Sequence, residues 1–457
     1  MLIRYPRGQQ STGAGCPPER TTLRWIGLRL TVLALAIPSS PLAQSTGQTV
    51  RHHKVAEESS FPPELIQAES AIEKKDYATA EPLLKKVVAG DPNNYQAWFD
   101  LGFVYNGLGN TEESIAAYRK AVTAKPDVFE SNLNLGLMLA KTGQPDAAQF
   151  LDAATKLKPT ASPPEGLARA WISLAHVLEK DKPEEAVAAY QKAAELDPRN
   201  SEPHLAAGLL LEKANHFADA EEQYKQALGI DPKSNDALTG LANIYMRGQR
   251  LVDAEKVLRQ LVAVQPEDAG AHIQLGRILA ATGKNDEAVA ELQAGAKLAP
   301  QDSNLRRDLA DLYTTTKKYD LAESEYRALL AANPNDAQTH HSLGVALLRQ
   351  RKFPEAQREF LIAVKLKPDF GAAYGDLAVA AEENKNYELA IRAADARAKF
   401  LPEIPMSYFL RASAYDHLRA YKQAAENYHK FLEVANGQYP DQEWQARHRL
   451  IAIEPKK

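Results

Sequence analysis

Histidine pairs come nearest to a catalytic or metal-binding pattern in this sequence of 457 residues. His340 and His341 are adjacent, and adjacent helical residues point about 100° apart, which is poor geometry for gripping one metal ion. His52 and His53 lie in a polar stretch with no third ligand nearby. The single cysteine, Cys16, lies close to the N-terminus, so the rest of the chain has no disulfide and no thiol nucleophile. These residues favour neither a metal centre nor thiol chemistry.

Longer catalytic motifs are absent from the sequence. It contains no His-Glu-x-x-His zinc pattern, no phosphate-binding glycine loop and no Gly-x-Ser-x-Gly elbow. A net charge of −4 provides no broad basic surface for nucleic acid. We therefore predict that the protein is not an enzyme, uses no cofactor or metal, and binds no nucleic acid.

Most of the chain follows a sequence repeat with a period of 34 residues. Alanines recur at this step from Ala220 to Ala424, and prolines recur from Pro198 to Pro402. A third series of small residues, each Gly or Ala, runs in phase from Gly208 to Ala412. The unit at 201–234 has two stretches of helical apolar period, and Pro232 ends the second. A fixed period of this size indicates a repeat architecture.

The pattern within each unit resembles the tetratricopeptide repeat. Residues 95–128 show it most completely, with the bulky, small and proline residues Trp98, Leu101, Gly102, Tyr105, Tyr118, Ala121 and Pro126. The resemblance covers most of the chain and implies an all-α fold, a superhelical solenoid of stacked helix-turn-helix units. Packing residues define this family, so the resemblance specifies the fold more closely than the function.

Breaks in the repeat divide the chain into predicted parts. In order these are a signal peptide (1–43), a polar linker (44–60), repeat units 1–3 (61–161), a Pro-rich joint (162–167), units 4–11 (168–438) and a C-terminal capping helix with a tail (439–457). The first part combines basic residues, a short apolar run and a small-residue exit, as secretory signals do. Its apolar run is short for a membrane span of roughly 20 residues. An uncleaved anchor is the alternative. Prolines and small polar residues at the joint predict a loop.

The resemblance also implies where a partner binds. In this family the concave surface is lined mainly by positions 2, 5, 9, 12 and 13 of the first helix of each unit. Carried onto this sequence, those positions predict an apolar set, Phe99, Phe103, Leu133 and Leu137, and a polar set, Asn243, Arg247, Arg277, Asn304 and Arg307, with Asp311 beside it. Arginine and asparagine present several directional donors, which suit carboxylates or peptide backbone. The alternatives are core packing for the apolar set and a solvated face with local salt bridges for the polar set.

These inferences predict an exported scaffold of the bacterial envelope, periplasmic or secreted, that binds a protein or peptide segment in its concave groove. We expect no small-molecule substrate, and membrane association only if the N-terminal segment stays uncleaved. One alternative is a non-catalytic accessory subunit of an envelope polysaccharide-assembly or glycosyltransferase system, because the repeats also resemble the substrate-selecting arms of some glycosyltransferases. Another is a cytosolic or anchored regulator that keeps residues 1–43.

Overall fold

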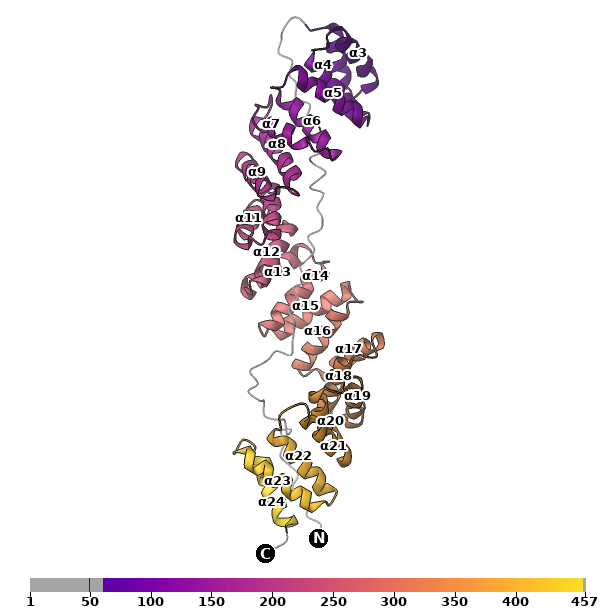
Figure 1. Cartoon of the computed structure of the whole chain (residues 1–457), viewed down its shortest axis with the longest axis vertical. Coiled ribbons are helices and arrows are strands. Elements are labelled where there is room, and N and C mark those ends of the chain that lie inside the picture. Colours follow the sequence, from indigo (N-terminus) through magenta and orange to yellow (C-terminus); the bar gives the residue numbers. More distant parts are fainter. Residues whose placement is uncertain (1–48, 50–60, 455–457) are drawn as a thin grey trace. The chain divides into compact units, whose positions relative to one another are not determined.

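The computed structural model describes residue 49 and residues 61–454, which form two compact bodies. The first body contains Thr49 and residues 61–266, and the second contains residues 267–454. Every regular element of the described residues is an α-helix (Figure 1). The predicted signal peptide and most of the predicted linker lie outside the described residues, so both stay predictions.

The first body is built from twelve helices. In chain order they are α2 (Pro63–Glu73), α3 (Tyr77–Gly90), α4 (Tyr95–Gly107), α5 (Thr111–Ala124), α6 (Phe129–Lys141), α7 (Ala147–Thr155), α8 (Pro163–Leu178), α9 (Pro183–Leu196), α10 (Glu202–Lys213), α11 (Phe217–Ile230), α12 (Asn235–Arg247) and α13 (Leu251–Val264).

The second body has eleven helices among its described residues. They are α14 (Ala269–Ala281), α15 (Asn285–Leu298), α16 (Ser303–Thr315), α17 (Tyr319–Ala332), α18 (Ala337–Arg349), α19 (Phe353–Leu366), α20 (Gly371–Glu383), α21 (Tyr387–Ala398), α22 (Pro405–His417), α23 (Tyr421–Ala435) and α24 (Pro440–Ile453).

Consecutive helices pack as pairs, which we describe as helix A followed by helix B. The described residues form six such pairs in the first body, α2 with α3 through α12 with α13. They form five pairs in the second, α14 with α15 through α22 with α23, and α24 packs on α23 (Figure 1). Each body is thus a helical solenoid, which confirms the predicted fold class.

A left-handed backbone residue lies between helix A and helix B in ten of these eleven pairs. The residues with positive φ are Lys75, Gly109, Gly143, Asn215, Gln249, Gly283, Lys317, Arg351, Lys385 and Arg419. Glycine adopts this conformation freely, whereas other residues take it at a cost of roughly 1–2 kcal/mol. The same turn therefore forms in nearly every unit with several residue types, because packing of the two helices determines it.

Small residues allow the helices to approach closely. A Cβ atom added to Gly208 of α10 would lie 2.8 Å from the ring of Tyr224, on the helix B of the same pair. One added to Gly240 of α12 would lie 2.3 Å from that ring, in contact across the next unit boundary. Ala220 and Ala254, from the alanine series, are fully buried. The small residues of the repeat therefore lie where two helices pack closely.

The predicted Pro-rich joint at 162–167 is mostly helical, which corrects our expectation of a loop. Helix α8 begins at Pro163, directly after Ser162 in the left-handed region (φ 43°). Proline is tolerated in a first helical turn because its missing N–H would have no helical partner there. The irregular segment lies upstream, where the Glu130 carboxylate accepts hydrogen bonds from the backbone N–H (2.9 Å) and the hydroxyl (2.6 Å) of Thr160.

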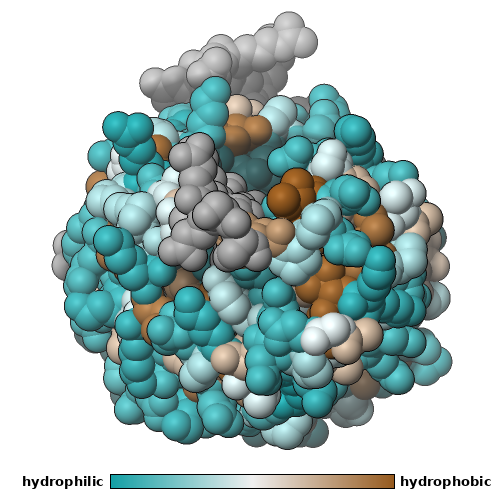
Figure 2. Space-filling view, turned by 90° about the horizontal axis from the view of Figure 1, so that it is seen from above, coloured by the Kyte–Doolittle hydropathy of each residue, from teal (hydrophilic) through white to brown (hydrophobic). Residues whose placement is uncertain are grey.

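Apolar side chains pack mainly between the helices. On the face drawn in Figure 2, hydrophilic residues predominate and hydrophobic ones form small separate patches. The helices of the described part of the chain are all too short or too polar to cross a membrane.

Candidate protein-binding face

All nine residues predicted to bind a partner lie on A helices. These are Phe99 and Phe103 on α4, Leu133 and Leu137 on α6, Asn243 and Arg247 on α12, Arg277 on α14, and Asn304 and Arg307 on α16. The first six belong to the first body and the last three to the second.

The apolar set is largely engaged in packing between helices. Phe99, Leu133 and Leu137 are at most 3% exposed. The Phe99 ring meets Tyr118 edge-on, with ring centroids 5.7 Å apart. Phe103 is half-buried, and its ring meets that of Tyr77 on α3 edge-on, with ring centroids 6.3 Å apart. Three of the four side chains thus lie in the core, and contact between this set and a partner stays a prediction.

Asn106 adds a polar group to the same face of α4. It lies at i+7 from Phe99, and its Nδ2 donates a hydrogen bond to the hydroxyl of Thr49 (3.1 Å). Thr49 is outside the repeats, so a groove position of α4 here binds a residue from another part of the chain. Sequence reasoning missed Asn106, although it stands at position 12 of its unit, which is one of the five groove positions.

A buried hydroxyl lies behind this contact. The Nδ2 of Asn134, on α6, donates to the hydroxyl of Tyr118 at 3.3 Å. Burial raises the pKa of Tyr118, and hydrogen bonds with Thr49 and Asn134 oppose that shift only in part. The hydroxyl is therefore neutral at physiological pH and is able to donate as well as accept. This uncharged contact between α5 and α6 is fully buried, so it supports the packing behind Asn106 and does not itself face solvent.

The polar set of the first body contains one buried and one exposed residue. Asn243 is 2% exposed, whereas Arg247, in the last turn of α12, is exposed. The Arg247 guanidinium lies over the Phe217 ring, 5.6 Å from its centroid. A cation in the last turn also interacts favourably with the helix dipole. Arg247 is thus a surface cation held in place from one side.

In the second body, Arg277 forms a buried ion pair. Its Nε donates to Asp308 Oδ2 on α16 at 2.7 Å, and its side chain is 3% exposed. Burial raises the pKa of Asp308, an effect opposed by the charge of Arg277 and by its hydrogen bond. This pair joins two successive A helices. Asn304, on the same helix as Asp308, is exposed.

Arg307 makes a similar link to the next A helix. Its two terminal nitrogens donate to Thr339 Oγ1 and Asp336 Oδ2, each at 2.8 Å. One unit further on, His341 Nε2 lies 2.7 Å from Asp376 Oδ2. A row of polar contacts therefore connects α14, α16, α18 and α20. The pairs of Arg277 with Asp308 and of Arg307 with Asp336 are local salt bridges, as the alternative for this set anticipated, while partner binding by the arginines stays a prediction.

Sequence reasoning missed the acidic members of this row. Asp308, Asp336 and Asp376 follow their basic partners by 31, 29 and 35 residues. The sequence signal for these contacts was a basic and an acidic residue separated by about 34 residues. The separation is close to the repeat length because each contact joins the A helices of neighbouring units.

The histidine pair at 340–341 is engaged in the same kind of structural contact. His340 Nδ1 lies 2.6 Å from Glu359, and its Nε2 lies 3.0 Å from the backbone oxygen of Pro334. Among residues 61–454, no cluster of three His, Cys, Asp or Glu side chains could hold a metal ion.

Comparison with known proteins supports the architecture. A family model described as the C-terminal domain of cilia and flagella-associated protein 70 matches residues 56–307, more than half of the chain. Two tetratricopeptide repeat models match residues 279–344 and 341–402. The chain belongs to the tetratricopeptide repeat family. Members of this family generally serve as non-catalytic scaffolds for protein–protein interaction, and the fold of this chain is that of such a scaffold.

Individual relatives match shorter stretches. Tetratricopeptide repeat protein 37 of Xenopus laevis is 37% identical over 87 residues, which are 19% of this chain and 6% of that protein. The chain therefore spans a small fraction of that relative. Among solved structures, YrrB, described as a TPR protein with an unusual peptide-binding site, is 22% identical with a TM-score of 0.38, covering 41% of this chain and 96% of its own. MamA from Desulfovibrio magneticus RS-1 is 21% identical with a TM-score of 0.34, covering 36% and 92%.

Proposed function

We propose that this protein is an exported, non-catalytic scaffold of the bacterial envelope. It binds an extended segment of a partner protein along the A-helix face of its repeats. The hydrogen bond from Asn106 to Thr49 carries the proposal, because it places a residue from outside the repeats on a groove position of α4.

The half-buried Asn106 and the exposed Arg247 suit a polypeptide ligand. Asn106 supplies an amide that both donates and accepts, and Arg247 supplies directional donors for a carboxylate or a backbone carbonyl. In the second body, the buried pair of Arg277 with Asp308 and the half-buried pair of Arg307 with Asp336 link successive A helices. A rigid row of this kind lowers the entropic cost of binding an extended chain.

Affinity capture from native envelope extract tests the binding face. The full chain is compared with Asn106→Glu combined with Arg247→Glu, and with the control Lys120→Glu on the exposed side of α5. Circular dichroism melting checks that all three proteins fold alike. We expect one partner to be retained by the parent and the control and lost with the double variant. Equal retention by all three proteins would remove this face from the proposal.

Export has a separate test. The basic and apolar pattern of residues 1–43 supports cleavage after Ala43, so N-terminal sequencing of the protein from its native host should begin at Gln44. A protein that retains its first 43 residues would refute cleavage, and one that fractionates with the cytosol would refute the exported location. Neither result would affect the binding face.

A further inference from the structure

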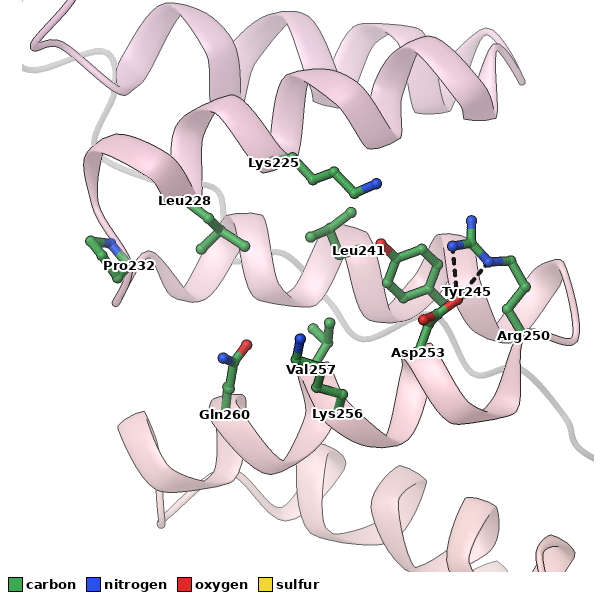
Figure 3. Close-up of a pocket in the computed structure, with 10 residues that line it drawn as sticks. All are labelled: Lys225, Leu228, Pro232, Leu241, Tyr245, Arg250, Asp253, Lys256, Val257 and Gln260. Carbon is green, nitrogen blue, oxygen red and sulfur yellow. Dashed lines mark hydrogen bonds and ion pairs between the residues drawn. The ribbon is translucent and has the colours of Figure 1, made fainter.

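A hollow of about 420 Å³ lies on the first body between α11, α12 and α13 (Figure 3). Its volume falls within the roughly 300–1,000 Å³ typical of small ligand sites. Leu228 of α11, Leu241 of α12 and Val257 of α13 supply apolar lining from three different helices. Such a surface would accept one or two aliphatic side chains.

The hollow and the predicted groove residues occupy opposite sides of α12. Leu241 and Tyr245 line the hollow, whereas Asn243 and Arg247 belong to the groove set. Residues two positions apart on a helix point about 200° apart, so a ligand in the hollow does not compete for the groove residues. The two surfaces can therefore be altered independently.

Part of the charge around the hollow is already compensated. The Glu221 carboxylate lies 2.7 Å from both Lys225 Nζ and Arg250 Nη1, and it accepts a hydrogen bond from the Tyr245 hydroxyl at 3.1 Å. Burial alone would raise the pKa of Glu221, but hydrogen bonds from Lys225, Arg250 and Tyr245 hold it below its usual value. Arg250 also pairs with Asp253 at 2.7 Å (Figure 3). Both carboxylates therefore have cationic partners within the chain.

Lys256 is the one cation of the hollow that has no acidic partner among residues 61–454. It lines the hollow from α13, and no carboxylate in the described part of the chain lies within ion-pair distance of its amine. Glu221 and Asp253 balance two of the three cations, Lys225, Arg250 and Lys256, which leaves one positive charge in excess. The hollow thus combines an apolar floor with one uncompensated positive charge.

We propose that this hollow is a second binding site, for an acidic aliphatic segment of a partner protein. A side-chain carboxylate of the segment pairs with Lys256, and a neighbouring aliphatic side chain packs against Leu228, Leu241 and Val257. The positive charge of Lys256 selects an acidic residue of the segment, and the apolar floor selects an aliphatic residue next to it. The ligand is therefore defined by both features together. The site does not depend on the concave face and would let one chain hold two partner segments.

Fluorescence anisotropy with synthetic peptides tests the proposal. The probe is fluorescein-labelled Gly-Leu-Asp-Leu-Glu-Gly, and its matched control is the amide peptide Gly-Leu-Asn-Leu-Gln-Gly. We expect the full chain to bind the acidic peptide about fivefold more tightly than the amide peptide, and the advantage to shrink with added salt. Equal affinities, or no saturable binding up to about 1 mM peptide, would overturn the proposal.

Three variants locate the binding. Lys256→Glu should weaken binding of the acidic peptide about tenfold, because attraction becomes repulsion, while Lys256→Arg should retain it. Lys120→Glu, an exposed change on α5, should have no effect beyond a small loss from net charge. Lys256 is exposed, so the melting temperature should stay unchanged in each case. Parental affinity in Lys256→Glu, or an equal loss in Lys120→Glu, would refute a site at this hollow.

Discussion

The buried pair of Arg277 and Asp308 permits a quantitative test of how the second body is held together. Asp308→Asn keeps the shape of the side chain and removes its charge, leaving a guanidinium that is 3% exposed without an ionic partner. Two unit charges about 4 Å apart interact by about 4 kcal/mol at an effective dielectric constant of about 20. Breaking a buried pair by removing one partner typically costs about 3–5 kcal/mol. The asparagine oxygen can still accept one hydrogen bond from Arg277, and burial already offsets part of the attraction in the parent, so we expect a smaller loss of about 1–2 kcal/mol in the free energy of unfolding.

The double replacement Arg277→Met with Asp308→Leu should behave differently. Burial raises the pKa of Asp308 despite the neighbouring arginine, which indicates that removing its charge from water is costly. Replacing both charges with apolar side chains removes that cost together with the attraction. The double variant should therefore unfold within about 1 kcal/mol of the parent or be more stable.

Urea unfolding followed by circular dichroism, combined with hydrogen exchange across α14–α17, measures these differences. Hydrogen exchange is included because repeat arrays can unfold unit by unit. The matched control is Asp286→Asn, which removes an exposed inter-repeat pair with Lys318 (3.5 Å) and should give no measurable change. If Asp308→Asn costs no more than Asp286→Asn, or if the double variant is the least stable of the series, the role assigned to this pair is wrong.

Two further predictions concern packing and pH. Gly240→Ala should lower the unfolding free energy by about 1–3 kcal/mol, because its new methyl group would meet the Tyr224 ring. Gly229→Ala, in α11 with open space around the added atom, should instead raise the unfolding free energy by up to about 1 kcal/mol. Thermal melting of the two variants in parallel measures both changes, and a change of the opposite sign in either variant would contradict this account. Burial would raise the pKa of Asp336, but hydrogen bonds from Thr339 and Arg307 hold it below its usual value. Its stabilising contribution is therefore present above the unfolded pKa of about 3.9 and lost as pH falls through the lower folded value, so the stability difference between the parent and Asp336→Asn should shrink below about pH 4. A difference independent of pH would contradict this account.

The sequence predicted the helical units well because their signals are local. Pro232 follows the end of α11 at Ile230 by two residues, and Gly208 lies against Tyr224 as a close helix contact requires. These features recur every 34 residues, and each depends on neighbours within one unit or the next. A periodic pattern of packing residues therefore predicts both the fold and the succession of helix pairs.

Sequence rules were less reliable for residue types that occur in two kinds of local structure. The prolines at 163–164 occur in loops and also in first helical turns, and the structure places them at the start of α8. Apolar residues at groove positions are equally ambiguous. From their position in the repeat alone, Phe99 and Leu133 could be exposed in the groove or buried in the core. Both are buried, because side chains of neighbouring units pack against them.

By itself, the sequence determined the family and the all-helical repeats, and it predicted which A-helix positions line a groove. Only the tertiary structure decided that Arg277 pairs with Asp308, that Asn106 contacts Thr49, and that Lys256, beside an apolar hollow, has no acidic partner among residues 61–454. The physical reason is the distance over which the contacts act. A 34-residue period specifies which side chains face the next unit. Ion pairs and hollows depend instead on the rotation between units, which is the sum of many contacts.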